Sequence, residues 1–195
     1  MSALGRFFRT VAADYAAMEK GRGKYRGDGR SYAALPGALV TRIGFQMTTA
    51  IRAMQLLRDA KIPFGPQVAS RMIRHLYGAE IHWDADLAPG LALVHGNGLV
   101  LSHSARVGAG CILFHNVTLG ESMDPLTKVQ GAPTLEANVH VGPGAVLLGP
   151  ITVGAGSKIM AGAVLTESVP AGTVVRPTPV EIVRRKKPDP ATTHD

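Results

Sequence analysis

The feature that most restricts the fold of this chain is an apolar residue at every sixth position beyond Gly78. The recurrence forms two series, and their thirteen members include no charged or strongly polar residue: Ile81, Leu87, Leu93, Leu99, Ala105, Cys111 and Val117, then Leu135, Val141, Leu147, Val153, Ile159 and Leu165. The fifth place of each six is often small or β-branched, as at Ala145 and Ile151. A helical region or a doubly wound α/β domain would not give a period of six.

Such a period is typical of a triangular solenoid, in which three short strands and three tight corners make one coil. Every sixth residue then points to the axis and must be aliphatic. The corners need positive φ or close backbone approach, which glycine supplies. The 23 glycines and the 5% aromatic content suit such narrow packing. The sequence therefore predicts a left-handed parallel β-helix of hexapeptide repeats from residue 81 to residue 170.

Residues 1–78 have a helical period and are predicted to form an α-helical N-terminal region. A glycine-rich break at 21–31 and a second break at 61–66 divide this region into three expected helices. Their apolar faces are Phe7, Val11, Tyr15 and Met18; Leu39, Ile43, Met47, Ile51, Met54 and Leu57, after Pro36; and Val68, Met72, Ile73 and Leu76.

The predicted β-helix domain, residues 79–183, contains an interruption at 120–133 that lacks the corner glycines of the repeat. This segment is expected to leave the coils as a protruding loop, and the apolar segments beyond residue 170 to cap the last coil. The basic tail, 184–195, is expected to be disordered.

The formal net charge of +7 is concentrated in residues 1–74 and 184–187. Few aromatic residues lie near these bases, so the charge favours a solvated helical surface, or a rim for a small anionic ligand, over nucleic-acid binding. The most apolar N-terminal stretch, residues 35–57, is broken by Arg42 and Arg52, which argues against a membrane span. The single cysteine, Cys111, excludes an internal disulfide, is compatible with a cytoplasmic location, and is expected to be a small buried hydrophobe.

Beyond its period, the region 77–183 resembles the serine O-acetyltransferase family of hexapeptide-repeat acyltransferases. The resemblance rests on an acidic residue before Ile-His, on a histidine fifteen residues after that acid, and on the Val-Thr-Leu-Gly run at 117–120. The acid is Glu80 and the histidine is His95. The family transfers acetyl from acetyl-CoA to a hydroxyl, so the resemblance implies that His95 is the general base and that Glu80 orients its imidazole. It implies no metal.

The resemblance also indicates where CoA binds. The pantetheine arm of CoA is expected to lie along two corners, one formed by Gly142, Pro143 and Gly144 and the other by Ala161 and Gly162. Lys158 is the expected partner of a phosphate, and the basic cluster at 184–187 could reach the nucleotide phosphates. The corner glycines are also required by the fold alone. A homotrimer is implied, with sites between neighbouring subunits, and a dimer of trimers is left open.

Three residues depart from the family's pattern for serine. Val94 replaces an aspartate before the base, and Gly131 and Ala132 replace an Arg-His pair in the loop. The acceptor is therefore left open between serine or a serine-like compound, a sugar or exopolysaccharide, and a biosynthetic intermediate. The alternative to an enzyme is a non-catalytic scaffold protein with the same β-helix fold.

Two further histidines are candidates for a place near the site. His115 precedes the Val-Thr-Leu-Gly run and is the reserve catalyst, while His103 is expected at the wall of the coil. The seven histidines have no cysteine pair or tight histidine motif beside them, so zinc is not expected.

Overall fold

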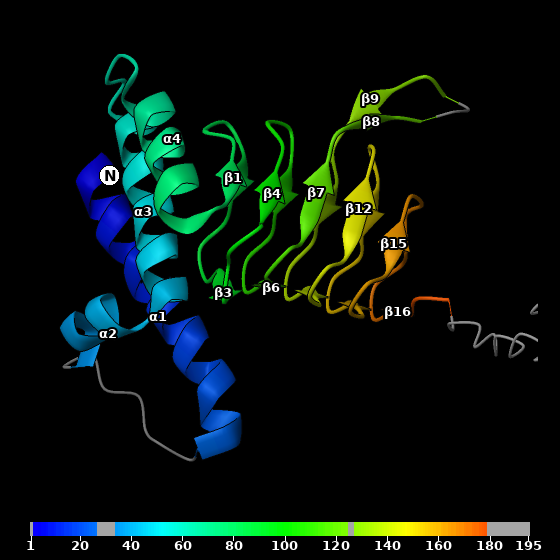
Figure 1. Ribbon diagram of the computed structural model, residues 1–195, viewed down its shortest axis with the longest axis horizontal. Helices are drawn as coiled ribbons and strands as arrows, with labels where there is room; N and C mark the ends of the chain where they lie inside the picture. The colour runs from blue at the N-terminus through cyan, green and yellow to red at the C-terminus, as the bar shows by residue number, and fades with distance from the viewer. Residues whose placement is uncertain (1, 27–33, 125–126, 179–195) are drawn as a thin grey trace, which may run out of the picture.

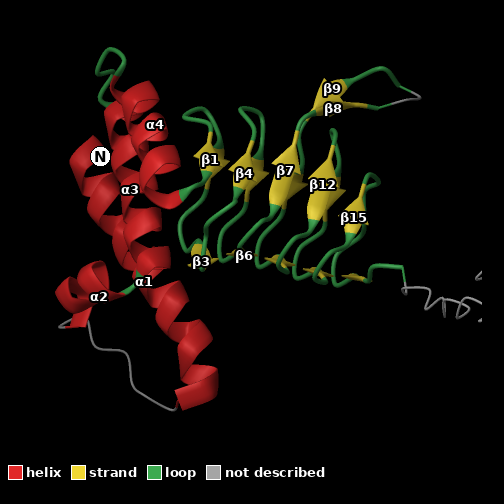
Figure 2. Ribbon diagram, viewed as in Figure 1, coloured by secondary structure: helices red, strands yellow, loops and turns green. Residues whose placement is uncertain are grey.

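The computed structural model describes residues 2–26, 34–124 and 127–178, which form a helical region followed by a solenoid of parallel strands (Figure 1). The helices are α1 (Ala3–Arg26), α2 (Leu35–Thr41), α3 (Ile43–Asp59) and α4 (Gly65–Tyr77). They gather at the end of the solenoid where its first strands begin, and Figure 2 shows the separation of helices from strands.

Three parallel sheets form the walls of the solenoid. The first contains β1 (Glu80–Ile81), β4 (Val100–Leu101), β7 (Thr118–Gly120), β12 (Val146–Leu148) and β15 (Val164–Leu165). The second contains β2 (Asp86–Leu87), β5 (Arg106–Val107), β10 (Thr134–Leu135) and β13 (Thr152–Val153). The third contains β3 (Ala92–Val94), β6 (Ile112–Phe114), β11 (His140–Val141), β14 (Lys158–Ile159) and β16 (Val174–Val175). The chain visits the sheets in turn, as predicted for a hexapeptide-repeat β-helix, and the fold class is confirmed.

The interior of the solenoid is apolar, and all thirteen residues of the predicted six-residue series are buried. Their register differs from the prediction in one respect. Ile81 pairs with Leu101, a separation of 20 positions, whereas Leu101 pairs with Leu119, a separation of 18. The first coil therefore holds two extra residues, which lie in the corner 95–98.

The six-residue period does not reveal the extra residues, because each coil buries two series of apolar residues that lie two positions apart in the sequence. Leu99 and Val117 are buried, but they lie beside the corners, while Leu101 and Leu119 are the inward residues of the strands. After an insertion of two residues, every sixth position falls on the other buried series, and no polar residue is placed in the interior. The prediction of one unbroken strand register from 81 to 117 is therefore wrong, although the prediction that these residues are buried is confirmed.

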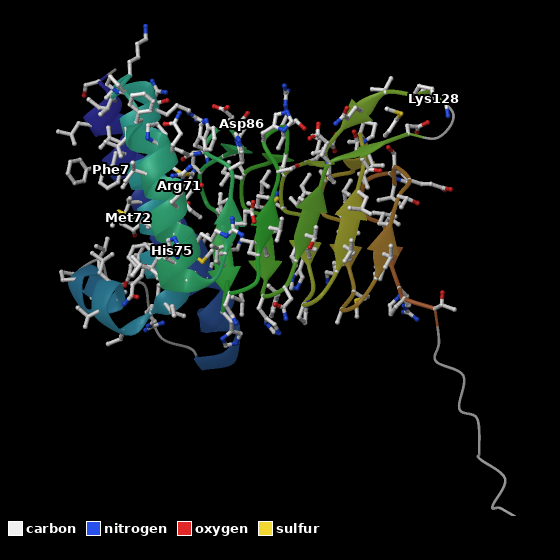
Figure 3. The ribbon with its side chains drawn as sticks, turned by 45° about the horizontal axis from the view of Figure 1, so that its top comes forward. Phe7, Arg71, Met72, His75, Asp86 and Lys128 are labelled. Atoms are coloured by element: carbon white, nitrogen blue, oxygen red, sulfur yellow. The ribbon has the colours of Figure 1, made fainter. Side chains whose placement is uncertain are left out.

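The interruption at 120–133 leaves the first sheet as an antiparallel hairpin of β8 (Ser122–Met123) and β9 (Gln130–Gly131). Figure 3 shows Lys128 at the outer part of this hairpin, away from the solenoid. Val107 pairs with Leu135 across 28 positions, ten more than the 18 that separate Leu101 from Leu119, so the excursion adds ten residues before the chain rejoins the second sheet. After Pro170, Val174 and Val175 pair with β14 and extend the third sheet instead of capping it. Residues 181–183 and the tail at 184–195 lie outside the described residues.

The helical region differs from its prediction at two helix boundaries. Helix α1 continues to Arg26 through the start of the expected break, because its glycines weaken a helix without ending it. The expected second helix is divided at Arg42, whose extended backbone separates α2 from α3. Ile43 consequently leaves the predicted stripe and is 53% exposed.

The apolar face of α4 is largely uncovered within this chain. Of its predicted stripe only Ile73 is buried, while Val68, Met72 and Leu76 are exposed. Figure 3 shows Met72 on the side of α4 that faces away from the strands. Periodicity predicts that a helix face is apolar, but it does not predict which surface covers that face. None of the described helices is long and apolar enough to cross a membrane.

A buried ion pair ties the helical region to the first coil. Arg52 on α3 bonds both carboxylate oxygens of Asp14 on α1, at 2.8 and 3.0 Å, and also donates to the carbonyls of Leu87 and Ala88. The same carboxylate accepts hydrogen bonds from the backbone N–H groups of Gly90 and Leu91. Burial raises the pKa of the Asp14 carboxyl, and Arg52 with the two N–H groups opposes that shift.

Cys111 is fully buried, as predicted, and its Sγ lies 3.1 Å from the Glu136 carbonyl oxygen. Burial raises the pKa of its thiol. The cysteine is therefore part of the core.

Replacing Arg52 by Met is expected to lower the free energy of unfolding by about 3–5 kcal/mol, because it leaves Asp14 buried without its counter-ion. Urea denaturation measures this loss. Arg6, which pairs with Asp59 at 2.8 Å from an exposed position, provides the control. Arg6→Ala is expected to cost less than about 1 kcal/mol. Equal losses in the two variants would show that the buried pair has no special role.

Candidate active site

The corners that lead from the third sheet to the first stack on one another and form one edge of the solenoid, here called the His95 edge. Backbone hydrogen bonds join its successive coils. Asn116 N–H donates to the Asn97 carbonyl (2.9 Å), Gly144 N–H to the His115 carbonyl (3.1 Å), and Gly162 N–H to the Pro143 carbonyl (2.9 Å). The predicted base and both predicted CoA corners therefore lie on the same edge.

His95 occupies the corner that holds the two extra residues. Its backbone has φ = 69°, a left-handed conformation that residues other than glycine rarely adopt. Gly96 follows with φ = 68°, and a Cβ on it would meet the Met47 sulfur of α3 at 2.6 Å. The glycine thus lets the corner approach the helical region, and the corner leaves the His95 side chain exposed to solvent. Strained backbone of this kind is often retained at functional sites.

His115 is the side chain that the structure places against His95. Their ring centroids are 5.7 Å apart, and the ring planes meet at 71°, an edge-to-face contact. The Nδ1 atom of His115 is buried and has no hydrogen-bond partner within the described part of the chain. The reserve catalyst of the sequence prediction therefore lies directly beside the predicted base.

Glu80 lies on the first sheet, opposite Val100, the strand residue that follows the His95 corner. Its carboxylate is 58% exposed and lies 3.6 Å from the guanidinium of Arg74. The structure records no hydrogen bond between Glu80 and His95 among its described residues. The two predicted partners thus stand in neighbouring strands, with the carboxylate engaged by α4.

A surface hollow of about 380 Å³ lies on the third sheet beside the His95 edge. It is lined by His140, Gly142, Pro143, Lys158, Ile159, Met160 and Ala161. Four of the six residues predicted to bind CoA line this hollow, and the other two, Gly144 and Gly162, lie in the adjoining corners. A surface hollow lined by glycine and proline corners and one cation suits an extended ligand with a phosphate.

Three lining or neighbouring side chains were missed by the sequence analysis. Phe114 stacks on His140 with ring centroids 5.2 Å apart, and Met160 is partly exposed at the same hollow. Phe114 follows the buried Leu113 and His140 precedes the buried Val141, so neither side chain belongs to the six-residue apolar series that predicted the interior.

His103 lies elsewhere, on the edge between the first and second sheets. Its Nδ1 is 3.3 Å from a Glu121 oxygen, and its ring contacts that of His82 at 5.7 Å. Burial lowers the pKa of His82. The His103 side chain is 52% exposed, so its predicted place at the coil wall is wrong, because the register shift moved it outward. Among the described residues, no three histidine, cysteine or carboxylate side chains gather as a metal site would require.

The three departures from the family's serine pattern occupy two places. Val94 pairs with Phe114 in the third sheet, immediately before His95. Gly131 and Ala132 form the base of the hairpin, where a Cβ on Gly131 would meet Pro150 at 3.0 Å and Ala132 is buried. The hairpin base is thus closely packed around small residues, and a larger side chain at 131 would require Pro150 to move.

The strain at His95 has a measurable consequence. His95→Asn is expected to raise the free energy of unfolding by up to about 1 kcal/mol, because asparagine tolerates the left-handed conformation better than histidine does. Chemical denaturation would detect the gain. His75, which is exposed on helix α4, is the matched control. His75→Asn is expected to give no gain, and a stability loss in His95→Asn would show that the corner is not strained.

Comparison with known proteins shows the family of the chain. Residues 132–167 match the model of the bacterial transferase hexapeptide (six repeats) family. The serine acetyltransferase of Synechococcus elongatus is 34% identical over 180 residues, which are 91% of this chain and 69% of that protein. The Helicobacter pylori serine acetyltransferase is 34% identical over 132 residues, 67% of this chain and 75% of that protein. The crystal structure of Neisseria gonorrhoeae serine acetyltransferase in complex with serine superposes with a TM-score of 0.75 at 27% identity, covering 92% of this chain and 71% of that one. The chain therefore belongs to the serine acetyltransferase family of acyltransferases.

Proposed function

We propose that this protein is an O-acetyltransferase that moves an acetyl group from acetyl-CoA to the hydroxyl of a small acceptor, with His95 as general base. One observation carries the proposal. The hollow lined by Gly142, Pro143, Lys158 and Ala161 adjoins the same edge that presents His95. A pantetheine arm lying along this hollow would bring its thioester toward the His95 imidazole.

The reaction balances with one histidine. His95 accepts the proton of the acceptor hydroxyl as that oxygen bonds to the carbonyl carbon of the thioester, since an alcohol is a weak nucleophile near neutral pH. The carbon–sulfur bond then breaks, and the thiolate takes the proton from His95. The acceptor leaves as its acetyl ester, CoA leaves as the free thiol, and His95 is neutral again.

Glu80 is proposed to orient and polarise the His95 imidazole. Its strand lies beside the one that follows the His95 corner, and its exposed carboxylate can turn from Arg74 by side-chain rotation. A carboxylate hydrogen-bonded to one ring nitrogen fixes the tautomer that leaves the other nitrogen free to accept a proton.

Lys158 is proposed to bind a phosphate of CoA, because it is a cation at the hollow on the third sheet. The cluster at 184–187 is proposed from the sequence to reach the nucleotide phosphates. The subunit is proposed to act as a homotrimer in the cytoplasm, with each site completed by a neighbouring subunit. No resident metal takes part in the proposed mechanism.

Serine is the first acceptor to test, because the similar proteins are named for it. The apolar Val94 before the base and the small residues Gly131 and Ala132 at the hairpin base favour a comparison with sugar acceptors as well. Serine, homoserine and simple sugars can be compared by the release of free thiol from acetyl-CoA. Turnover with a sugar but not with serine would place the acceptor among carbohydrates. Absence of CoA binding by calorimetry at millimolar concentration would favour a scaffold instead.

His95→Ala is expected to lower kcat/KM for acetyl transfer by about 10²–10⁴-fold, the usual contribution of a positioned general base. Glu80→Gln is expected to lower kcat by a smaller factor while leaving the KM for acetyl-CoA unchanged. Thiol release measures both. His75→Ala, which changes an exposed histidine on α4, should retain full turnover. Full activity in His95→Ala would refute the assignment of the base.

Lys158→Ala is expected to raise the KM for acetyl-CoA about tenfold and to leave kcat nearly unchanged, since a phosphate contact is kept in both ground and transition states. The same change at Lys128, an exposed residue of the hairpin that does not line the hollow, is the control and should alter neither constant. A fall in kcat at constant KM in Lys158→Ala would contradict a role in CoA binding.

A further inference from the structure

We propose that His115 is a second catalytic residue, whose Nδ1–H donates a hydrogen bond to the carbonyl oxygen of the thioester during acetyl transfer. The proposal rests on the proposed function, because it needs acetyl-CoA on the His95 edge. It assigns a role to a histidine that the general-base mechanism leaves unused.

The position of His115 is the first support. It lies on the His95 edge between the base and the corner at 142–144. On one side its ring contacts the ring of His95, with centroids 5.7 Å apart. On the other side its carbonyl accepts the hydrogen bond from Gly144 N–H at 3.1 Å. A thioester that extends from the hollow on the third sheet to His95 of the same subunit would lie along His115.

The state of the Nδ1 atom is the second support. This nitrogen is buried, and the described residues offer it no hydrogen-bond partner. A buried polar atom without a partner destabilises a folded protein, so its presence calls for a partner that the isolated chain lacks. An oxygen of the bound thioester becomes a partner of the right kind when the His115 ring turns about its Cβ–Cγ bond and brings Nδ1 to the surface, since neutral imidazole with its proton on Nδ1 is a donor there.

The chemistry of the reaction gives this donor a use. Negative charge develops on the carbonyl oxygen when the acceptor oxygen bonds to the carbonyl carbon. A donor that the fold holds against the carbonyl oxygen stabilises this charge. When the carbon–sulfur bond breaks, the charge returns to the departing sulfur and the hydrogen bond weakens. No proton leaves His115, so His95 alone transfers protons and the balance of the reaction is unchanged.

The contact with His95 also allows a simpler role, in which the His115 ring only holds the base in place. Two substitutions separate the roles. His115→Phe keeps a flat ring against His95 but removes the nitrogen. His115→Asn removes the ring and keeps an amide N–H near the position of Nδ1. A hydrogen bond to the thioester predicts that asparagine rescues activity, whereas a positioning role predicts that phenylalanine does.

The experiment measures thiol release from acetyl-CoA by the native protein and by each variant, using the acceptor with the highest turnover. His115→Phe is expected to lower kcat about 10²-fold with little change in the KM for acetyl-CoA, as for loss of one oxyanion donor. His115→Asn is expected to stay within about tenfold of the unchanged protein.

Thermal unfolding and calorimetric binding of CoA establish that each variant is folded. A His115→Phe variant with full kcat would overturn the proposal, and so would an impaired His115→Asn beside an active His115→Phe. His95→Ala in the same assay tests the proposed function separately. Loss of turnover in His95→Ala with full turnover in His115→Phe would leave the acetyltransferase mechanism standing and refute only the role of His115.

Discussion

The stacking of each coil on the one before it is the constraint on which the rest of this structure depends. A single coil has strands of two or three residues and cannot bury its own interior, so its inward side chains must lie on those of the neighbouring coil. Parallel backbone hydrogen bonds then hold equivalent corners above one another. Corners that are far apart in the sequence become a continuous edge, and this edge brings the two histidines and the glycine corners into one row.

The first coil needs a different support, because no coil precedes it. The helical region covers that end, and the Asp14–Arg52 pair joins α1, α3 and the corner after β2 through buried hydrogen bonds. The His95 corner belongs to this same coil and approaches α3 through Gly96. The strained backbone of the candidate base is therefore held between the solenoid and the helical region, and the fold stabilises a conformation that histidine alone would avoid.

Much of the fold and part of the site could be predicted from the sequence, for identifiable reasons. The interior of the solenoid was predictable because an aliphatic residue every six positions is a requirement of each coil. His95 and the hollow residues Gly142, Pro143, Lys158 and Ala161 were predictable only through the resemblance to a family. The contact between His95 and His115 was not predictable, because two extra residues at 95–98 shift the register, and both buried series accept that shift.

The sequence by itself determined the repeat and the apolar interior, since both are properties of residue type and spacing along the chain. The candidate base followed from the resemblance to a family. Only the tertiary structure decided which histidines meet. His103 and His115 looked equivalent by their place in the repeat, yet one pairs with Glu121 on another edge and the other contacts His95. The physical reason is that neighbours across coils depend on the length of every intervening corner, and a corner changes length without a change in hydrophobic pattern.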